Sequence, residues 1–188
     1  MSAWLAPLRD ADLDPADRER VATATAFMGF DANDVRTMAR VPGLLAAMAS
    51  VVDCCYRPGR VDAELKRLVA HVSSRAAGCQ YCEAHTAHGV LESGIDPRRL
   101  QDVWSYETSD RFSAAEKVAL RFAVEVGAGG IGNHDELRQF FDADEAAELL
   151  AILSLFAFLN RWNRTAQTEL EAQPEASLAT TRSKREMA

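Results

Sequence analysis

Two cysteines and a histidine at helical spacing are the clearest chemical signal in this chain. Cys79 and Cys82 lie three residues apart, and His85 follows three residues after the second cysteine. Residues three apart share one face of a helix, so these side chains form a row. Two thiols so placed can close a disulfide across one turn, and a neutral imidazole can accept and return their protons. The pattern indicates thiol redox chemistry.

A glycine directly before the pair marks the helix boundary that must position it. The segment from Asp62 has apolar residues at helical intervals and is expected to end at Gly78. A second helix is expected from Cys79 to about Glu92. Free N–H groups and the dipole at a helix start stabilise a thiolate, more strongly at Cys79 than at Cys82. The sequence therefore predicts a helix–turn–helix that carries the cysteine pair.

The rest of the chain also has the pattern of helices. Ser113 and Glu116 form a capping box, and no stretch alternates with the period of a strand. We therefore predict an all-α fold. The chain has 188 residues, of which 48% are hydrophobic, which is enough for one core. Residues 1–172 are predicted to form a single helical domain, and the polar residues 173–188 are predicted to form a disordered tail.

Composition argues against several classes of partner. The net charge of −7 gives no electrostatic support for binding nucleic acid. The longest apolar-rich run, Ala146 to Leu159, contains Glu148 and is shorter than a membrane span, so no membrane partner is expected. The N-terminus lacks a basic segment followed by an apolar run. A cytoplasmic location is therefore expected.

The remaining cysteines and the glycine-rich loop have simpler interpretations. Cys54 and Cys55 are adjacent, close to a Pro-Gly turn, and are interpreted as small hydrophobic residues at a helix end. The loop from Gly127 to Gly132 lacks the Lys-Ser/Thr of a phosphate-binding loop and follows a helix, so it is interpreted as a connector.

A metal site is one alternative interpretation of the cysteine segment. Cys79, Cys82, His85 and His88 are all potential ligands within one short run. A tetrahedral metal site needs ligands that converge from at least two directions, and these four lie on a single helix. The sequence therefore predicts no metal. The other alternative is that the two cysteines are only small residues packed in the core. The helix-ending glycine before them and the histidine one turn after them make this alternative less favoured.

Three segments resemble the carboxymuconolactone decarboxylase family, and within it the alkylhydroperoxidase D-like, peroxidase-related branch. They are Leu65–Ala70, Gly78–Thr86 and Phe158–Asn163, within a likeness that covers roughly residues 44–170. The resemblance implies an all-helical fold and homo-oligomers. It also implies reduction of alkyl hydroperoxides without haem, flavin or another cofactor, with a thiol or dithiol as the reductant.

The resemblance also implies roles for the two thiols. In the family the second cysteine, here Cys82, meets the peroxide, and the first, here Cys79, resolves the intermediate. The position at the helix start instead favours Cys79 as the more acidic thiol. We follow the family order, with Cys82, Cys79 and His85 as the expected site, because a nearby histidine can outweigh dipole position.

The chain departs from the family pattern at two relay positions. The family has a glutamate where this chain has Arg67, and a histidine where it has Thr86, with His85 one place earlier. Glu64 and His71, each near Arg67 along the helix, are candidate replacements. An arginine close to the thiols would lower their pKa but cannot carry protons at neutral pH.

These observations favour a thiol-dependent peroxidase. The alternatives are a non-enzymatic redox-responsive protein or a disulfide-exchange partner. A lactone decarboxylase is less favoured, since those family members do not use a cysteine pair. Arg161 and Trp162 are interpreted as core or subunit contacts.

Overall fold

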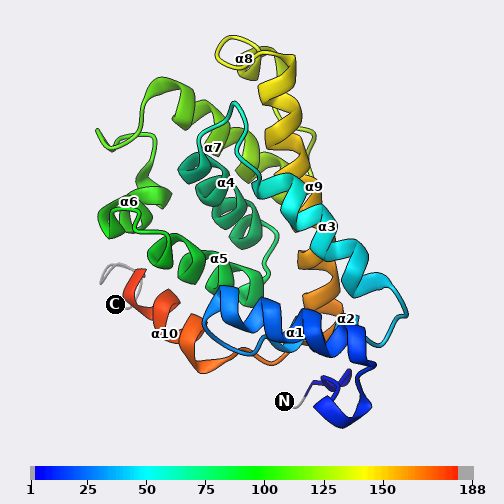
Figure 1. The fold of residues 1–188 in the computed structure, drawn as a ribbon. Helices are drawn as coiled ribbons and strands as arrows, with labels where there is room; N and C mark the ends of the chain where they lie inside the picture. The colour runs from blue at the N-terminus through cyan, green and yellow to red at the C-terminus, as the bar shows by residue number, and fades with distance from the viewer. Residues whose placement is uncertain (1–2, 182–188) are drawn as a thin grey trace.

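The computed structural model describes residues 3–181. Within that range the chain forms α-helices and short 3₁₀-helices, which are joined by turns and loops, and it forms no β-strand (Figure 1). The all-α prediction is confirmed. The α-helices are α1 (Pro15–Met28), α2 (Asn33–Met38), α3 (Leu44–Tyr56), α4 (Ala63–Ala76), α5 (Gln80–Glu92), α6 (Pro97–Asp102), α7 (Ala114–Gly127), α8 (His134–Leu137), α9 (Ala143–Ala166) and α10 (Ala172–Thr181).

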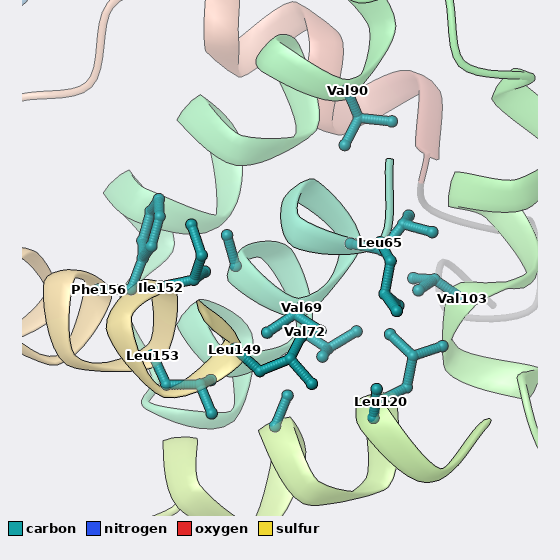
Figure 2. Close-up of a cluster of buried hydrophobic side chains, with 14 of the residues drawn as sticks. Leu65, Val69, Val72, Val90, Val103, Leu120, Leu149, Ile152, Leu153 and Phe156 are labelled. Atoms are coloured by element: carbon teal, nitrogen blue, oxygen red, sulfur yellow. The ribbon is translucent and has the colours of Figure 1, made fainter. Parts of the chain in front are cut away.

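The core is built around α4, which packs against α5, α7 and α9 (Figure 1). Leu68, Val69 and Val72 of α4 are fully or almost fully buried, as are Leu120 of α7 and Ile152 of α9. Figure 2 shows several of these side chains converging between the helices. Burying one such side chain contributes about 1.5–3 kcal/mol. The packing of these helices holds the start of α5 in a fixed position.

Capping side chains place the helix starts where the sequence predicts them. The Asp62 side chain accepts hydrogen bonds from the N–H groups of Glu64 and Leu65 at the start of α4. At the start of α7, Ser113 and Glu116 form the predicted capping box. These bonds satisfy N–H groups that have no partner within the helix.

The turn between α4 and α5 is as tight as the sequence predicts. Gly78 has a φ of +69°, a left-handed conformation that glycine adopts without steric cost. The Cys79 N–H donates to the Ser74 carbonyl at 3.0 Å, which closes the end of α4. The turn brings the first residues of α5 back against the packed helices.

The longest helix, α9, is a core helix. Leu149 and Ile152 are buried against α4, and Glu148 forms an ion pair of 2.8 Å with the buried Lys66. Leu150, on the opposite side, is exposed. No helix within residues 3–181 has both the length and the apolarity needed to cross a bilayer.

The prediction of a disordered tail from residue 173 is wrong for the part that the structure describes. Residues Ala172–Thr181 form α10, which packs against α5 (Figure 1). Pro174 and Leu178 are buried there. The polar composition hid this helix, because only two side chains within Ala172–Thr181 are buried and their partners lie far away in the chain. The rest of the predicted tail, residues 182–188, lies outside the described residues.

We expect Leu178→Ala to lower the free energy of unfolding by about 2–3 kcal/mol, because it removes a buried anchor of α10. Urea denaturation followed by circular dichroism measures this change. Leu150→Ala is the matched control: Leu150 is 53% exposed and Leu178 only 3%. The control should change stability by no more than about 0.5 kcal/mol. Equal effects of the two substitutions would contradict the docked position of α10.

Candidate functional site

The two thiols of the motif meet at the N-terminus of α5. Cys79 is the N-cap residue, and its Sγ accepts a hydrogen bond from the Cys82 N–H at 3.4 Å. Both cysteines are free thiols and are almost fully enclosed, with Cys79 1% and Cys82 3% exposed. The cysteine pair therefore lies at a helix start, as the sequence predicts.

The surroundings shift the two thiols in opposite directions. A hydrogen bond from the Cys82 thiol lowers the pKa of Cys79; burial opposes this shift, while the Cys82 N–H and the charge of Arg164 add to it. Burial raises the pKa of Cys82 well above its usual value. When the reduced pair loses one proton, the thiolate therefore forms at Cys79 and Cys82 keeps its proton.

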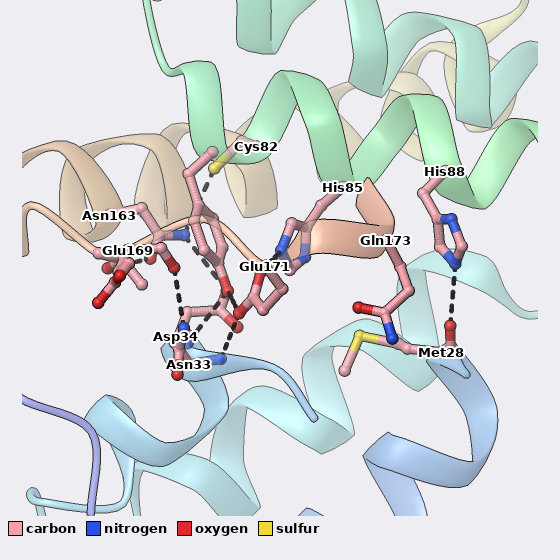
Figure 3. A network of polar contacts seen from close by, with 12 residues as sticks. Met28, Asn33, Asp34, Cys82, His85, His88, Asn163, Glu169, Glu171 and Gln173 are labelled. Atoms are coloured by element: carbon pink, nitrogen blue, oxygen red, sulfur yellow. Dashed lines mark hydrogen bonds and ion pairs between the residues drawn. The ribbon is translucent and has the colours of Figure 1, made fainter. Parts of the chain in front are cut away.

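An amide from a distant segment lies against Cys82, and a carboxylate from another lies behind the amide (Figure 3). Asn163, from α9, donates through Nδ2 to Cys82 Sγ at 3.4 Å and to Asp34 Oδ2 at 3.2 Å. The Asp34 N–H, at the start of α2, donates to the Tyr81 hydroxyl at 3.2 Å. These bonds connect Cys82 to the start of α2 through the Asn163 side chain.

The histidine of the motif is paired with a glutamate from the C-terminal segment. His85 Nε2 lies 2.7 Å from Glu171 Oε2, and the imidazole stacks on the Tyr81 ring at 4.0 Å between centroids. The other oxygen of Glu171 accepts from the Tyr81 hydroxyl at 2.8 Å and from the Asn33 N–H at 2.6 Å. Figure 3 shows the carboxylate held between α5 and the start of α2.

The ionised form of Glu171 is stabilised by these contacts. Burial alone would raise the pKa of Glu171, but its hydrogen bonds, above all the one from His85, hold that pKa below its ordinary value. The edge of the Phe30 ring closes the other side of His85, with centroids 5.0 Å apart. A histidine oriented by a carboxylate is a suitable group for moving protons.

The structure brings some of the predicted site residues together and keeps others apart. Cys79 and Cys82 touch, whereas no hydrogen bond joins His85 to either sulfur within residues 3–181, and its Nε2 faces Glu171. Glu64 forms an ion pair of 2.6 Å with Arg99. The Arg67 guanidinium lies 5.3 Å from the centre of the Tyr56 ring and beside Gly89, about two turns along α5 from Cys82.

The third relay candidate, His71, lies behind the motif. Burial lowers the pKa of His71 to about 4, so it is neutral at neutral pH. Its Nδ1 is 3.1 Å from the Thr86 hydroxyl, which in turn bonds the Cys82 carbonyl at 2.7 Å. His71 and Thr86 thus support the backbone of the cysteine helix.

Three residues that border the thiols or His85 were not singled out by sequence reasoning. Asp34 and Glu171 come from opposite ends of the chain, and no spacing pattern connects either to the motif. Asn163 did fall within a segment that resembles the family, but as one residue of a helix without an assigned role. Only the folded chain brings the three together.

Comparison with known proteins places the chain in a family. The model of the carboxymuconolactone decarboxylase family matches residues 42–125. The structure of the debrominase Bmp8 is 30% identical, covers 96% of this chain and 99% of its own, and has a TM-score of 0.88. The protein belongs to the carboxymuconolactone decarboxylase family. No curated protein matches the sequence.

Two further structures are similar over nearly the whole chain. A Bmp8 variant with one cysteine replaced by alanine, in complex with 2,3,4-tribromopyrrole, is 29% identical, covers 96% of this chain and 98% of its own, and has a TM-score of 0.88. An uncharacterized peroxidase-related protein from Ralstonia eutropha JMP134 with an alkylhydroperoxidase AhpD core is 21% identical, covers 92% of this chain and 96% of its own, and has a TM-score of 0.78. The last similarity supports the AhpD-like fold alone.

Proposed function

We propose that this protein is a dithiol oxidoreductase that reduces an electrophilic substrate while Cys79 and Cys82 become a disulfide. The observation that carries the proposal is the contact between the two enclosed cysteines at the start of α5, with the Cys82 N–H on Cys79 Sγ at 3.4 Å. The opposite directions of the two pKa shifts mean that Cys79 ionises before Cys82. Loss of one proton therefore leaves one thiolate and one thiol, the state from which two-electron chemistry starts.

An alkyl hydroperoxide is the first substrate class. The Cys82 sulfur attacks the outer peroxide oxygen as its proton passes to the Cys79 thiolate, giving a sulfenic acid and an alkoxide. The alkoxide takes that proton and leaves as the alcohol. The Cys79 thiolate then attacks the sulfenic sulfur, closes the disulfide and releases hydroxide. One hydroperoxide is reduced by two electrons for each disulfide formed.

The pair formed by His85 and Glu171 assists with protons on the substrate side. Glu171 holds the imidazole through a contact of 2.7 Å, which fixes the orientation of the ring. From this place His85 relays that proton from Cys79 to the leaving alkoxide through its other ring nitrogen. It takes the part that the family gives to residues at the positions of Arg67 and Thr86.

Reductive debromination is the second candidate, favoured by the likeness to Bmp8 at 30% identity over 96% of this chain. The same pair supplies the chemistry. A proton is added to the bromine-bearing carbon of an electron-rich ring, and a thiolate then removes the bromine, which restores the aromatic ring. The other cysteine displaces bromide and closes the disulfide. One thiol and one thiolate thus convert the aryl bromide to arene, bromide and disulfide.

The test is a side-by-side turnover assay of the reduced protein with cumene hydroperoxide and with 2,3,4-tribromopyrrole. Alcohol product, released bromide and free thiols are measured in the same samples. The proposal predicts that two thiols disappear for each alcohol or each bromide, and the productive substrate decides between the two classes. Loss of thiols without either product, accompanied by a change of oligomer size, would favour a non-enzymatic redox-responsive protein instead.

A further inference from the structure

A polar groove lies close to the turn that precedes the cysteine pair. It has a volume of about 330 Å³ and is formed by the C-terminal end of α4, the loop after α7, and α9. Its lining includes Ala77, Gly127, Asn160, Arg161 and Arg164. A side chain at Gly127 would collide with Ser73, since its Cβ would lie 2.5 Å from the Ser73 carbonyl oxygen. The start of the glycine loop thus packs directly on the end of α4 and lines this groove.

The groove contains a buried acceptor that lacks a donor. Asn160 is only 4% exposed, and its Oδ1 has no hydrogen-bond partner among residues 3–181. An unpaired buried amide oxygen costs about 1–3 kcal/mol, so such atoms in native proteins normally have a partner. A ligand N–H group in the groove would supply the missing bond once the Asn160 side chain, whose Oδ1 is enclosed in this structure, rotates toward it.

The groove is also positively charged. Arg161 and Arg164 line it, and none of its described lining residues carries a carboxylate. Arg164 donates to the Ala77 carbonyl at 2.7 Å, which holds it beside the end of α4. Guanidinium groups bind carboxylates strongly and with defined geometry. The groove thus suits a ligand that carries both a carboxylate and an N–H group.

Two segments lead from this groove to the sulfurs. Asn160 precedes Asn163 by three residues on α9, about 4.5 Å along the helix axis, and Asn163 contacts Cys82 Sγ. Ala77 precedes Cys79 by two residues across the Gly78 turn. The charge of Arg164 also acts on the Cys79 sulfur. A ligand in the groove therefore lies next to the Cys79 side of the pair.

We propose that this groove binds the reductant of the Cys79–Cys82 disulfide, and that this reductant is a small cysteine-containing peptide with free carboxylates, of the glutathione type. Its carboxylate pairs with Arg161 and Arg164, and its amide N–H bonds to Asn160 Oδ1. This assignment rests on the proposed function, because it concerns the return of the oxidised pair to its reduced state.

The exchange needs two molecules of the thiol. The first thiolate attacks Cys79 Sγ, the Cys79–Cys82 bond breaks, and Cys82 leaves and takes up a proton. The second thiolate attacks the peptide sulfur of the mixed disulfide, and Cys79 leaves as a thiolate near Arg164. Two thiols lose two electrons and form one external disulfide, and the protein disulfide gains them.

The test follows reduction of the disulfide by glutathione and by the neutral 2-mercaptoethanol. The full-length protein is first oxidised with diamide, and free thiols are then trapped by alkylation and counted by mass spectrometry. We expect the rate to saturate with glutathione but to rise linearly with 2-mercaptoethanol. At equal thiolate concentration glutathione should be faster by about tenfold, the effect of one charge-assisted contact. Glutathione with esterified carboxylates should lose this advantage.

Arg161→Gln is the decisive variant because Arg161 is exposed and Gln keeps much of the side-chain length. It should lower the rate of disulfide reduction by glutathione about tenfold and leave the rate with 2-mercaptoethanol unchanged. Arg138→Gln, at an exposed arginine remote from the groove, is the matched control and should change neither rate. A linear glutathione dependence, or an unchanged preference for glutathione in Arg161→Gln, would overturn the assignment. Oxidation by diamide keeps this result separate from the proposed function, since it needs no substrate turnover.

Discussion

Cys82→Ser is expected to lower turnover of the productive substrate by on the order of a thousandfold or more, because it removes the sulfur that takes the oxygen or bromine. Serine has nearly the same size, and the Asn163 amide can still donate to its oxygen, so the enclosed site should keep its shape. The measurement is steady-state product formation with an excess of reductant.

Two other cysteine variants make this result specific. Cys54→Ser changes an exposed cysteine on α3 and should leave turnover unchanged. Cys79→Ser should allow one reaction at Cys82 but prevent closure of the disulfide, so a single equivalent of product forms and Cys82 carries the oxidised sulfur. Unchanged turnover in Cys82→Ser would remove Cys82 from the mechanism.

Glu171→Gln is expected to lower turnover by about a hundredfold, the usual contribution of one proton-transfer group. The amide keeps an oxygen for the Tyr81 hydroxyl and the Asn33 N–H, but it loses the charge that holds His85. The loss should appear in the rate of the chemical step and in a changed pH profile. Glu169→Gln is the matched control, since the Glu169 side chain is exposed and only its backbone carbonyl contacts Asn33.

The same glutamate should make stability depend on pH in a defined direction. The pKa of Glu171 is lower in the folded protein than the value of about 4.3 in an unfolded chain. Its carboxylate therefore stabilises the fold fully above that ordinary value, and this contribution is lost as the pH falls through the lowered pKa. The stability difference between the native protein and Glu171→Gln should shrink on acidification. A difference that grows on acidification would contradict the assigned state of Glu171.

The local parts of the site could be predicted from the sequence. The Gly78 boundary, the helix start at Cys79 and the capping box at Ser113 depend on residues within one or two turns of each other. A single sequence displays such relations directly, and the structure confirms them. The pKa of Cys79 is lowered, as its place at the helix start predicts, but the largest cause is the hydrogen bond from the Cys82 thiol, to which the Cys82 N–H adds.

The long-range parts could not be predicted in this way. Glu171 meets His85 across 86 residues of sequence, and Asn163 meets Asp34 across 129. Those contacts depend on how α2, α5 and α9 pack, which no local pattern encodes. The error at α10 has the same origin, because a polar helix anchored by Leu178 looks like a tail until its partner helix is known.

The departures at the family relay positions have a physical explanation in this fold. Thr86 bonds the Cys82 carbonyl and is supported by His71, so this position holds the cysteine helix in place. Arg67 lies against Tyr56. The proton-transfer role that we propose passes to His85 with Glu171, a pair that uses the C-terminal segment.

The most direct test of the account is to map the disulfide formed in a single turnover. Fully reduced protein is mixed with one equivalent of the productive substrate, the remaining thiols are alkylated, and the peptides are identified by mass spectrometry. The account predicts one disulfide, between Cys79 and Cys82, for each alcohol or bromide formed, with Cys54 and Cys55 alkylated as free thiols. Formation of product while Cys79 and Cys82 both remain free thiols would contradict it.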